Sequence, residues 1–105
     1  MQTIIITLDP EKLDNPDLDL RYTLPEQLEQ WTHGAVTDNG YDYLDDQLLG
    51  IWLETESAEE AYPLVVDLLQ KKTFMDNDLS QSAEIYISPL EAADLAQCQQ
   101  VYPEF

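Results

Sequence analysis

The chain has 105 residues, of which 22 are acidic and four are basic, so its formal net charge is −18. A negative field of this size opposes direct contact with nucleic acid or with an anionic membrane, and it attracts cationic partners. The length fits one domain, and a hydrophobic content of 44% is enough for one core. We therefore expect residues 1–105 to form a single acidic α/β domain. An alternative stays open, in which the acidity serves only solubility or tolerance of salt.

The cysteine content and the N-terminus both bear on the compartment. The single cysteine, Cys98, has no partner for a disulfide within the chain. Residues 1–6 lack a basic segment before their apolar run, so they do not resemble a signal peptide. No apolar stretch approaches the roughly 20 residues of a membrane span. We expect a cytoplasmic protein.

The first predicted element is a strand over residues 2–8, whose β-branched residues alternate between two faces. Asp9 and Pro10 end this strand, because proline cannot continue a central ladder. Residues 9–22 are acidic, contain two prolines and lack clear periodicity, so they are predicted to form a loop. A loop of this length in a small domain is typically functional or mobile.

Three predicted helices begin with a capping box, in which a hydroxyl residue precedes a glutamate by three positions. The three pairs are Thr23 with Glu26, Ser57 with Glu60, and Ser88 with Glu91. The first pair predicts a short helix that carries Leu24, Leu28 and Trp31 on one face and ends at Gly34.

The second capping box opens the most regular helical pattern of the chain. Its buried stripe is predicted to consist of Ala61, Leu64, Val65, Leu68 and Leu69. Pro63 conflicts with this helix, because it removes one backbone hydrogen bond. The third capping box predicts a short C-terminal helix with Pro89 in its first position. The residues expected to face inward from that helix are Leu95, Cys98 and Tyr102.

Two strands are predicted between the first two helices, over residues 35–44 and 48–54, with a hairpin turn at residues 45–47. Asn39-Gly40 is a competing turn signal within the first of them. Residues 84–87 form the last predicted strand. The order is then β-α-β-β-α-β with a C-terminal helix, which fits an α+β ferredoxin-like sandwich. In that fold a four-stranded antiparallel sheet carries its helices on one face.

Residues that would carry catalysis are scarce. His33 lies beside the expected helix end, where it is typically involved with the last carbonyl groups rather than with chemistry. Cys98 lies on the apolar side of a predicted helix, which favours a buried structural role. The three glycines, Gly34, Gly40 and Gly50, belong to no phosphate-binding motif. We therefore expect no enzyme and no cofactor.

Acidic residues are numerous enough for clusters to arise by chance. The densest runs are Asp14, Asp17 and Asp19; Asp38, Asp42, Asp45 and Asp46; and Asp76 with Asp78. A calcium loop needs oxygen ligands at fixed offsets, a glycine in its sixth position and a distal glutamate. None of the runs meets this pattern, so no metal site is predicted and most of these carboxylates are expected on a solvated face.

Tyrosines mixed with these carboxylates indicate a binding surface. Tyr22 borders one acidic stretch, and Tyr41 and Tyr43 lie within another. Tyrosine is enriched in interface hot spots, and carboxylates supply steering and specificity toward a basic partner. The predicted contact residues are Tyr41, Asp42, Tyr43, Asp45 and Asp46, joined by Asp14, Asp17 and Asp19. The alternative is that Tyr41 and Tyr43 simply pack on the sheet.

The function that these features favour is binding to a basic protein, such as a nuclease-type bacterial toxin, whose surface the protein would occlude. In size, charge and lack of catalytic residues the chain resembles in kind small acidic immunity proteins and nucleic-acid-mimicking inhibitors, although no motif is shared. A small enzyme or ligand-binding domain on a ferredoxin-like scaffold is one alternative. A structural subunit of a larger assembly is another.

Overall fold

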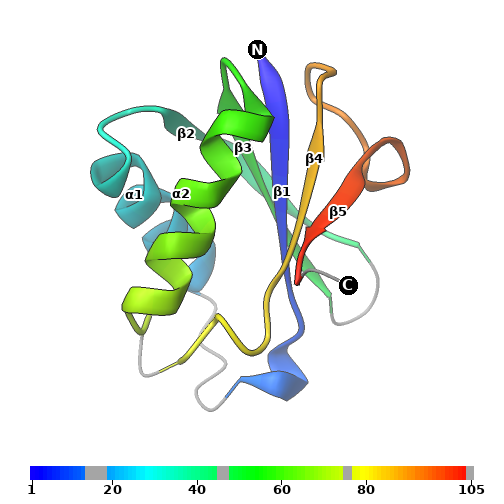
Figure 1. Cartoon of the computed structure of the whole chain (residues 1–105). Coiled ribbons are helices and arrows are strands. Elements are labelled where there is room, and N and C mark those ends of the chain that lie inside the picture. Colours follow the sequence, from blue (N-terminus) through cyan, green and yellow to red (C-terminus); the bar gives the residue numbers. More distant parts are fainter. Residues whose placement is uncertain (14–18, 45–47, 75–76, 104–105) are drawn as a thin grey trace.

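The computed structural model describes residues 1–13, 19–44, 48–74 and 77–103 (Figure 1). The strands are β1 (Gln2–Leu8), β2 (Val36–Tyr43), β3 (Leu49–Thr55), β4 (Glu84–Ser88) and β5 (Gln99–Tyr102). The helices are α1 (Leu20–Trp31) and α2 (Ala58–Lys71), with short 3-10 turns η1 (Pro10–Lys12) and η2 (Leu95–Gln97). The predicted order β-α-β-β-α-β is confirmed. The longest helix among the described residues is α2, whose 14 residues are fewer than the roughly 20 that a membrane span needs.

The five strands form one antiparallel sheet in the order β2-β3-β1-β4-β5. β1 is central, and its alternating side chains supply both faces of the sheet, as the sequence pattern predicts. Ile4 and Ile6 lie opposite Leu53 and Ile51 of β3, and both belong to the core that α1 and α2 complete. Figure 1 shows the two helices on the same side of the sheet. The core is therefore a layer between the sheet and the helices.

The other face of the sheet is covered by the segment that follows β4. The Thr3 hydroxyl donates to the carbonyl of Leu90 at 2.8 Å and accepts from the Ala93 amide at 3.2 Å. The Trp52 indole donates to the Ala93 carbonyl at 2.9 Å. Ile5, which points to this face, is fully buried. The central strands are therefore apolar on both sides because both sides are covered.

The predicted C-terminal helix is wrong, and a fifth strand takes its place. The Ser88 side chain accepts a hydrogen bond from the Leu90 amide, two residues on, so it forms a turn and does not cap a helix. Ala92 has a positive φ of 47°, which a continuing helix excludes. The chain then returns through η2 and pairs with β4 as β5. The sheet consequently has five strands, where the sequence predicts four.

Helix α1 begins earlier than predicted, at Leu20, so the capping box at Thr23 is wrong. Thr23 lies inside the helix because the buried stripe of Leu24 and Leu28 extends one turn back to Leu20. The predicted loop over residues 9–22 is correspondingly shorter, and it also contains η1. The helix ends at Trp31, and the turn that ends it includes Gly34, as predicted. The Gly34 amide donates to the Glu29 carbonyl in a Schellman arrangement, in which His33 has a positive φ of 54°.

Two further predictions concern β2 and α2. Asn39-Gly40 does not split β2; it lies at a bulge, where the register with β3 shifts between Asp38 and Tyr41. The Ser57 side chain accepts from the Glu60 amide, which confirms the start of α2. The predicted buried stripe holds except at Leu64, which is 41% exposed.

Candidate functional site

Four of the eight predicted contact residues lie within the described part of the chain. Tyr41, Asp42 and Tyr43 are on the edge strand β2, and Asp19 occupies the N-cap position of α1. All four are exposed. The remaining predicted residues, Asp14, Asp17, Asp45 and Asp46, lie outside the described residues.

The two tyrosines of β2 share one face of the sheet. Tyr41 pairs with Ile51 and Tyr43 with Leu49, both of which point to the helix side. Asp42 pairs with Gly50 and so points to the opposite side. This arrangement matches the alternation expected for a strand. Tyr41 and Tyr43 nevertheless remain 39% and 45% exposed, because β2 is at the edge of the sheet and α1 covers only part of it.

A third tyrosine joins them from α1. The Tyr22 ring meets the Tyr41 ring edge to face, with centroids 5.8 Å apart and planes at 89°. The Tyr41 and Tyr43 rings form a second edge-to-face pair, at 6.4 Å and 85°. Such pairs stabilise an arrangement of rings beyond the burial of their surface. We call Tyr22, Tyr41 and Tyr43 the tyrosine cluster; Tyr22 is the most exposed of the three, at 52%.

The guanidinium of Arg21 lies against this cluster. Its Cζ atom is 4.8 Å from the centroid of the Tyr22 ring and 5.0 Å from that of the Tyr41 ring. Both distances are within the range of cation–π attraction. Sequence reasoning missed Arg21, although its position directly before Tyr22 and the scarcity of basic residues in this chain were available as signals.

Tyr22, Tyr41 and Arg21 influence one another's protonation. Hydrogen bonding with Tyr41 lowers the pKa of Tyr22, and the neighbouring Arg21 charge lowers it further. Hydrogen bonding with Tyr22 raises the pKa of Tyr41. Hydrogen bonding with Tyr22 raises the pKa of Arg21, and Tyr43 contributes in the same direction. Four side chains from a helix and a strand therefore form one interacting group at the surface.

Aspartates cap the open edge of β2 beside the cluster. The Leu44 amide donates to the Leu48 carbonyl toward β3, so the Tyr43 amide, one residue earlier, points to the open edge. That amide donates to the Asp42 carboxylate at 2.8 Å. The Gly40 amide donates in the same way to Asp38 at 2.9 Å. The bond from the Tyr43 amide occupies a donor that an added strand would need, so at this position β2 is less open to pairing through its backbone.

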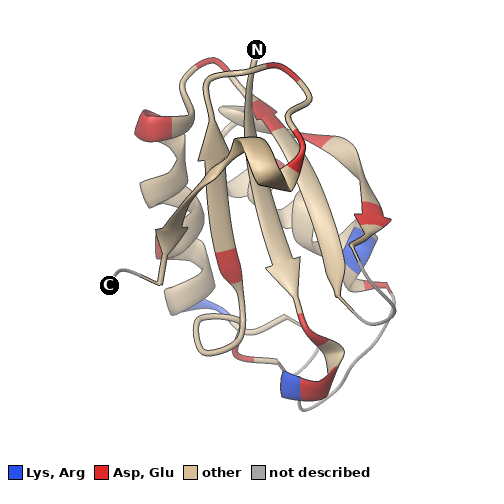
Figure 2. Cartoon of the chain, turned by 90° about the vertical axis from the view of Figure 1, so that its right-hand side faces the viewer, with Lys and Arg blue, Asp and Glu red and all other residues tan. Residues whose placement is uncertain are grey.

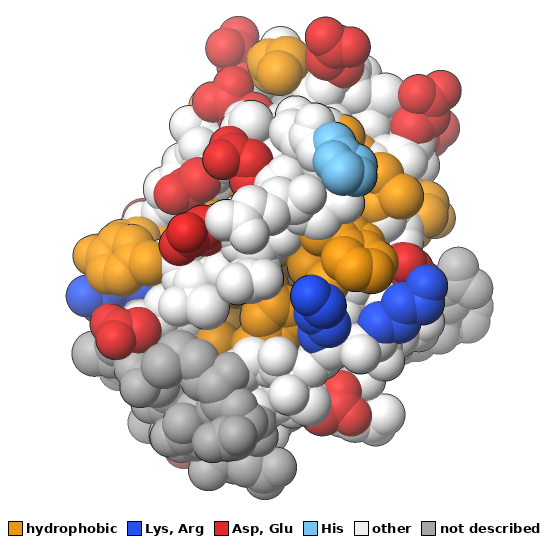
Figure 3. Space-filling view, turned by 90° about the vertical axis from the view of Figure 1, so that its left-hand side faces the viewer, with side chains coloured by type: hydrophobic (Ala, Val, Ile, Leu, Met, Phe, Trp, Pro, Cys, Tyr) orange, Lys and Arg blue, Asp and Glu red, His pale blue; other side chains and the backbone are white. Residues whose placement is uncertain are grey.

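Acidic side chains dominate the surface around the sheet. Figure 2 marks the positions of acidic residues along loops and at strand ends, and those of basic residues at few places. On the helix side, Figure 3 shows exposed hydrophobic side chains directly beside basic ones. One such contact joins Trp31 of α1 to Lys71 and Lys72 at the end of α2, at 5.9 and 5.4 Å. Three of the four basic residues thus lie against aromatic rings: Arg21, Lys71 and Lys72.

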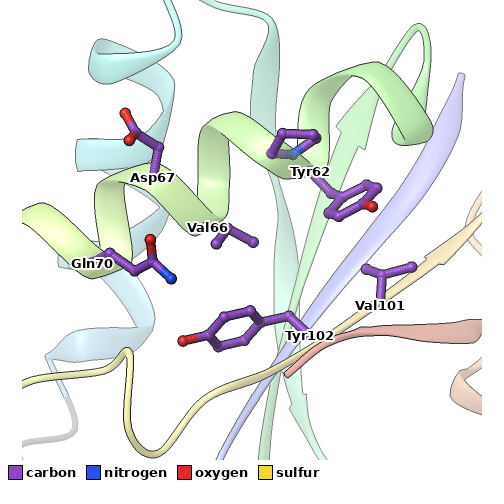
Figure 4. Close-up of a pocket in the computed structure, with 7 residues that line it drawn as sticks. Tyr62, Val66, Asp67, Gln70, Val101 and Tyr102 are labelled. Atoms are coloured by element: carbon purple, nitrogen blue, oxygen red, sulfur yellow. The ribbon is translucent and has the colours of Figure 1, made fainter. Parts of the chain in front are cut away.

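A separate hollow of about 510 Å³ lies between α2 and β5. Figure 4 shows Tyr62, Val66 and Gln70 of α2 facing Val101 and Tyr102 of β5. The Tyr102 hydroxyl donates to the Ser80 carbonyl. Asp67, also on its lining, forms an ion pair with Lys71 at 3.0 Å.

The two residues considered for catalysis do not come together. His33 is exposed at the end of α1, and it lines a different hollow from Cys98. Cys98 is half-buried in the connection to β5, where burial, followed by the Asp94 charge, raises the pKa of its thiol. The helix predicted to bury Cys98 is absent. Within the described part of the chain, no group of three or more His, Cys, Asp or Glu side chains is placed to hold a metal ion.

No protein-family model matches the chain, and no curated protein or solved structure matches it at a significant level.

Proposed function

We propose that this protein is an acidic binding module that occludes a basic surface of a protein partner, as an immunity or inhibitor protein does for a nuclease-type bacterial toxin. The observation that carries the proposal is the tyrosine cluster. Three half-exposed phenol rings from α1 and β2 meet on the surface of a chain whose net charge is −18. Such rings supply contact area and hydroxyl groups, and the acidic field supplies the attraction.

The charge also limits the kind of partner. With 22 acidic and four basic residues, most carboxylates have no cation within the chain to pair with. A basic protein surface, such as the one a nuclease uses to bind its substrate, would be drawn toward this field and its positive charges would be neutralised. Asp19, whose charge acts on Tyr22, and the exposed aspartates of the edge strand, Asp38 and Asp42, would contact such a surface at the rim.

The proposal extends to the fold and the compartment. We propose that the sheet order β2-β3-β1-β4 with α1 and α2 on one face is a ferredoxin-like sandwich to which β5 adds an edge strand. We also propose that the protein acts in the cytoplasm, where the free thiol of Cys98 would remain reduced.

The test measures association and nuclease inhibition with a panel of purified basic nuclease toxin domains, and with hen lysozyme as a basic protein of another class. We expect the parent to inhibit a member of the panel, with an association rate that falls as salt is added. Tyr41→Ala with Tyr43→Ala should speed dissociation by tenfold or more, since interface truncations act mainly on the off-rate. Tyr62→Ala, in the α2–β5 hollow, is the matched control and should bind like the parent.

A second pair of variants separates the site from the overall charge. Asp38→Asn with Asp42→Asn lowers the negative charge by two but retains an oxygen that can accept from the Gly40 and Tyr43 amides. Glu56→Gln with Glu91→Gln makes the same charge change at exposed positions elsewhere. The proposal requires the aspartate pair to slow association more than the glutamate pair. Equal effects would place the interface elsewhere, and binding to no member of the panel would contradict the proposed function.

A further inference from the structure

Arg21 is an unusual residue to find at the centre of the proposed interface. The field of the chain attracts cations, yet one of its own four basic side chains lies against the tyrosine cluster. The Nε atom of Arg21 is buried, and this atom has no hydrogen-bond partner among the described residues. A buried donor without a partner lowers stability, so its presence in a structure calls for an explanation.

The geometry indicates what Arg21 does there. Arg21 and Tyr22 are consecutive on α1 and so do not share a helix face, but the guanidinium still lies 4.8 Å from the Tyr22 ring. It also lies 5.0 Å from the Tyr41 ring on β2. One planar cation thus touches rings from two elements, and Tyr43 is linked to them through Tyr41.

Half-exposed tyrosines that lack such a partner exchange between rotamers, and a binding partner must then order them at a cost in affinity. A guanidinium can stack on aromatic rings and donate to hydroxyl groups from a fixed plane. A lysine ammonium, as a compact charge on a flexible stem, cannot reproduce this combination.

We propose that Arg21 is the positioning residue of the tyrosine cluster: it holds Tyr22 and Tyr41 in their binding arrangement before a partner arrives. The consequence for affinity depends on the proposed function, whereas the positioning itself is a property of the free protein. The two parts can therefore be tested separately.

The first experiment needs no partner. The protein is labelled with 3-fluorotyrosine, and the ¹⁹F spectra of the parent, Arg21→Lys and Arg21→Met are recorded through an alkaline titration, with resonances assigned by single Tyr→Phe variants. In the parent, Tyr22 should ionise before Tyr41. In Arg21→Lys, which keeps the net charge, both signals should show increased ring motion and their pKa values should move closer together. In Arg21→Met, the pKa of Tyr22 should also rise, because the nearby positive charge is lost.

Unfolding midpoints and the signals of Tyr62, Tyr86 and Tyr102 serve as controls for the fold. If Arg21→Met does not fold, Arg21→Lys alone decides the result. Unchanged motion and unchanged pKa values of Tyr22 and Tyr41 in a folded Arg21→Lys variant would overturn the proposal.

The second experiment measures dissociation from the nuclease domain that the parent binds in the panel described above. We expect Arg21→Lys to dissociate about tenfold faster in the parent background, and to have little further effect when Tyr41 is already alanine. An undiminished effect in the Tyr41→Ala background would show that Arg21 contacts the partner directly, which contradicts a positioning role. If no domain of the panel binds, the proposed function fails, and the fluorine spectra alone decide the role of Arg21.

Discussion

At the scale of single residues, Thr3 decides the path of the C-terminal segment. Its hydroxyl donates to the Leu90 carbonyl and accepts from the Ala93 amide, so it binds backbone groups that a helix beginning at Pro89 would use internally. The hydrogen bond from the Trp52 indole to the Ala93 carbonyl acts in the same direction. A capping box at Ser88 therefore does not produce a helix, because partners distant in the sequence satisfy the same groups.

Cys98 provides a prediction at this scale. Burial raises the pKa of its thiol, and the Asp94 charge raises it further, so less thiolate is present at pH 8 in the folded protein than in the unfolded chain. We expect iodoacetamide to alkylate the folded protein more slowly than the chain in urea, with the pH–rate profile displaced to higher pH. Asp94→Asn should increase the rate, since it removes a negative charge near the sulfur. Equal rates for the folded and the unfolded chain would contradict this account.

At the scale of the elements, α2 shows how far a periodic pattern can be trusted. Ala61, Val65, Leu68 and Leu69 are buried as the pattern predicts, but Leu64 is 41% exposed. At about 100° per residue, Leu64 lies at the border of the stripe, on the side away from Leu69. A pattern in the sequence locates the apolar face of a helix. Which residues at the border of that face are buried depends on how the helix is rotated over the sheet.

The two leucines give a matched test on one helix. Leu68→Ala removes a fully buried side chain, so it should lower the free energy of unfolding by about 2–5 kcal/mol. Leu64→Ala makes the same chemical change at an exposed position and should alter it by no more than about 0.5 kcal/mol. Urea unfolding of both variants measures the difference. Similar decreases in the free energy of unfolding in the two variants would contradict the rotation of α2 that buries Leu68 and exposes Leu64.

The strands and α2 could be predicted because their determinants are local. Alternating β-branched residues mark β1, and the Ser57 cap with a regular apolar stripe marks α2. The true start of α1 was missed because Leu20 lies in a stretch without a clear period, and its burial depends on the sheet beneath it. β5 was missed because a short strand with two glutamines is stabilised by pairing with β4 and has little pattern of its own.

The candidate site was predicted in part, for the same physical reason. Tyr41, Asp42 and Tyr43 alternate on one strand, so their faces follow from the sequence. The meeting of Tyr22 with Tyr41 joins α1 to β2 across a tertiary contact, and the position of Arg21 depends on that contact. Contacts between elements are set by packing, which a single sequence does not display.

At the scale of the whole molecule, the balance of charges governs stability. Only four basic side chains face 22 acidic ones, and three of the four lie against aromatic rings: Arg21, Lys71 and Lys72. Lys71 also forms an ion pair with Asp67. Most carboxylates thus repel one another across a small protein whose radius of gyration is 12.3 Å. Because this size is comparable to the Debye length of about 8–10 Å at physiological salt, repulsion across the molecule is sensitive to ionic strength.

The last prediction follows from this balance. Unfolding moves the carboxylates apart and relieves their repulsion, so the repulsion destabilises the folded state and salt should reduce that effect. We expect the melting temperature to rise most steeply between about 0.01 and 0.15 M NaCl, where the Debye length falls from about 30 to about 8 Å, and to level off above that range. A variant with Glu56, Glu59, Glu60 and Glu91 changed to glutamine carries four fewer negative charges and should show a smaller rise. A steady increase that continues into molar salt, equal in both proteins, would instead indicate a general salting-out effect on the buried apolar surface. A melting temperature independent of salt would mean that the acidic residues are too far apart in the folded protein to repel one another appreciably.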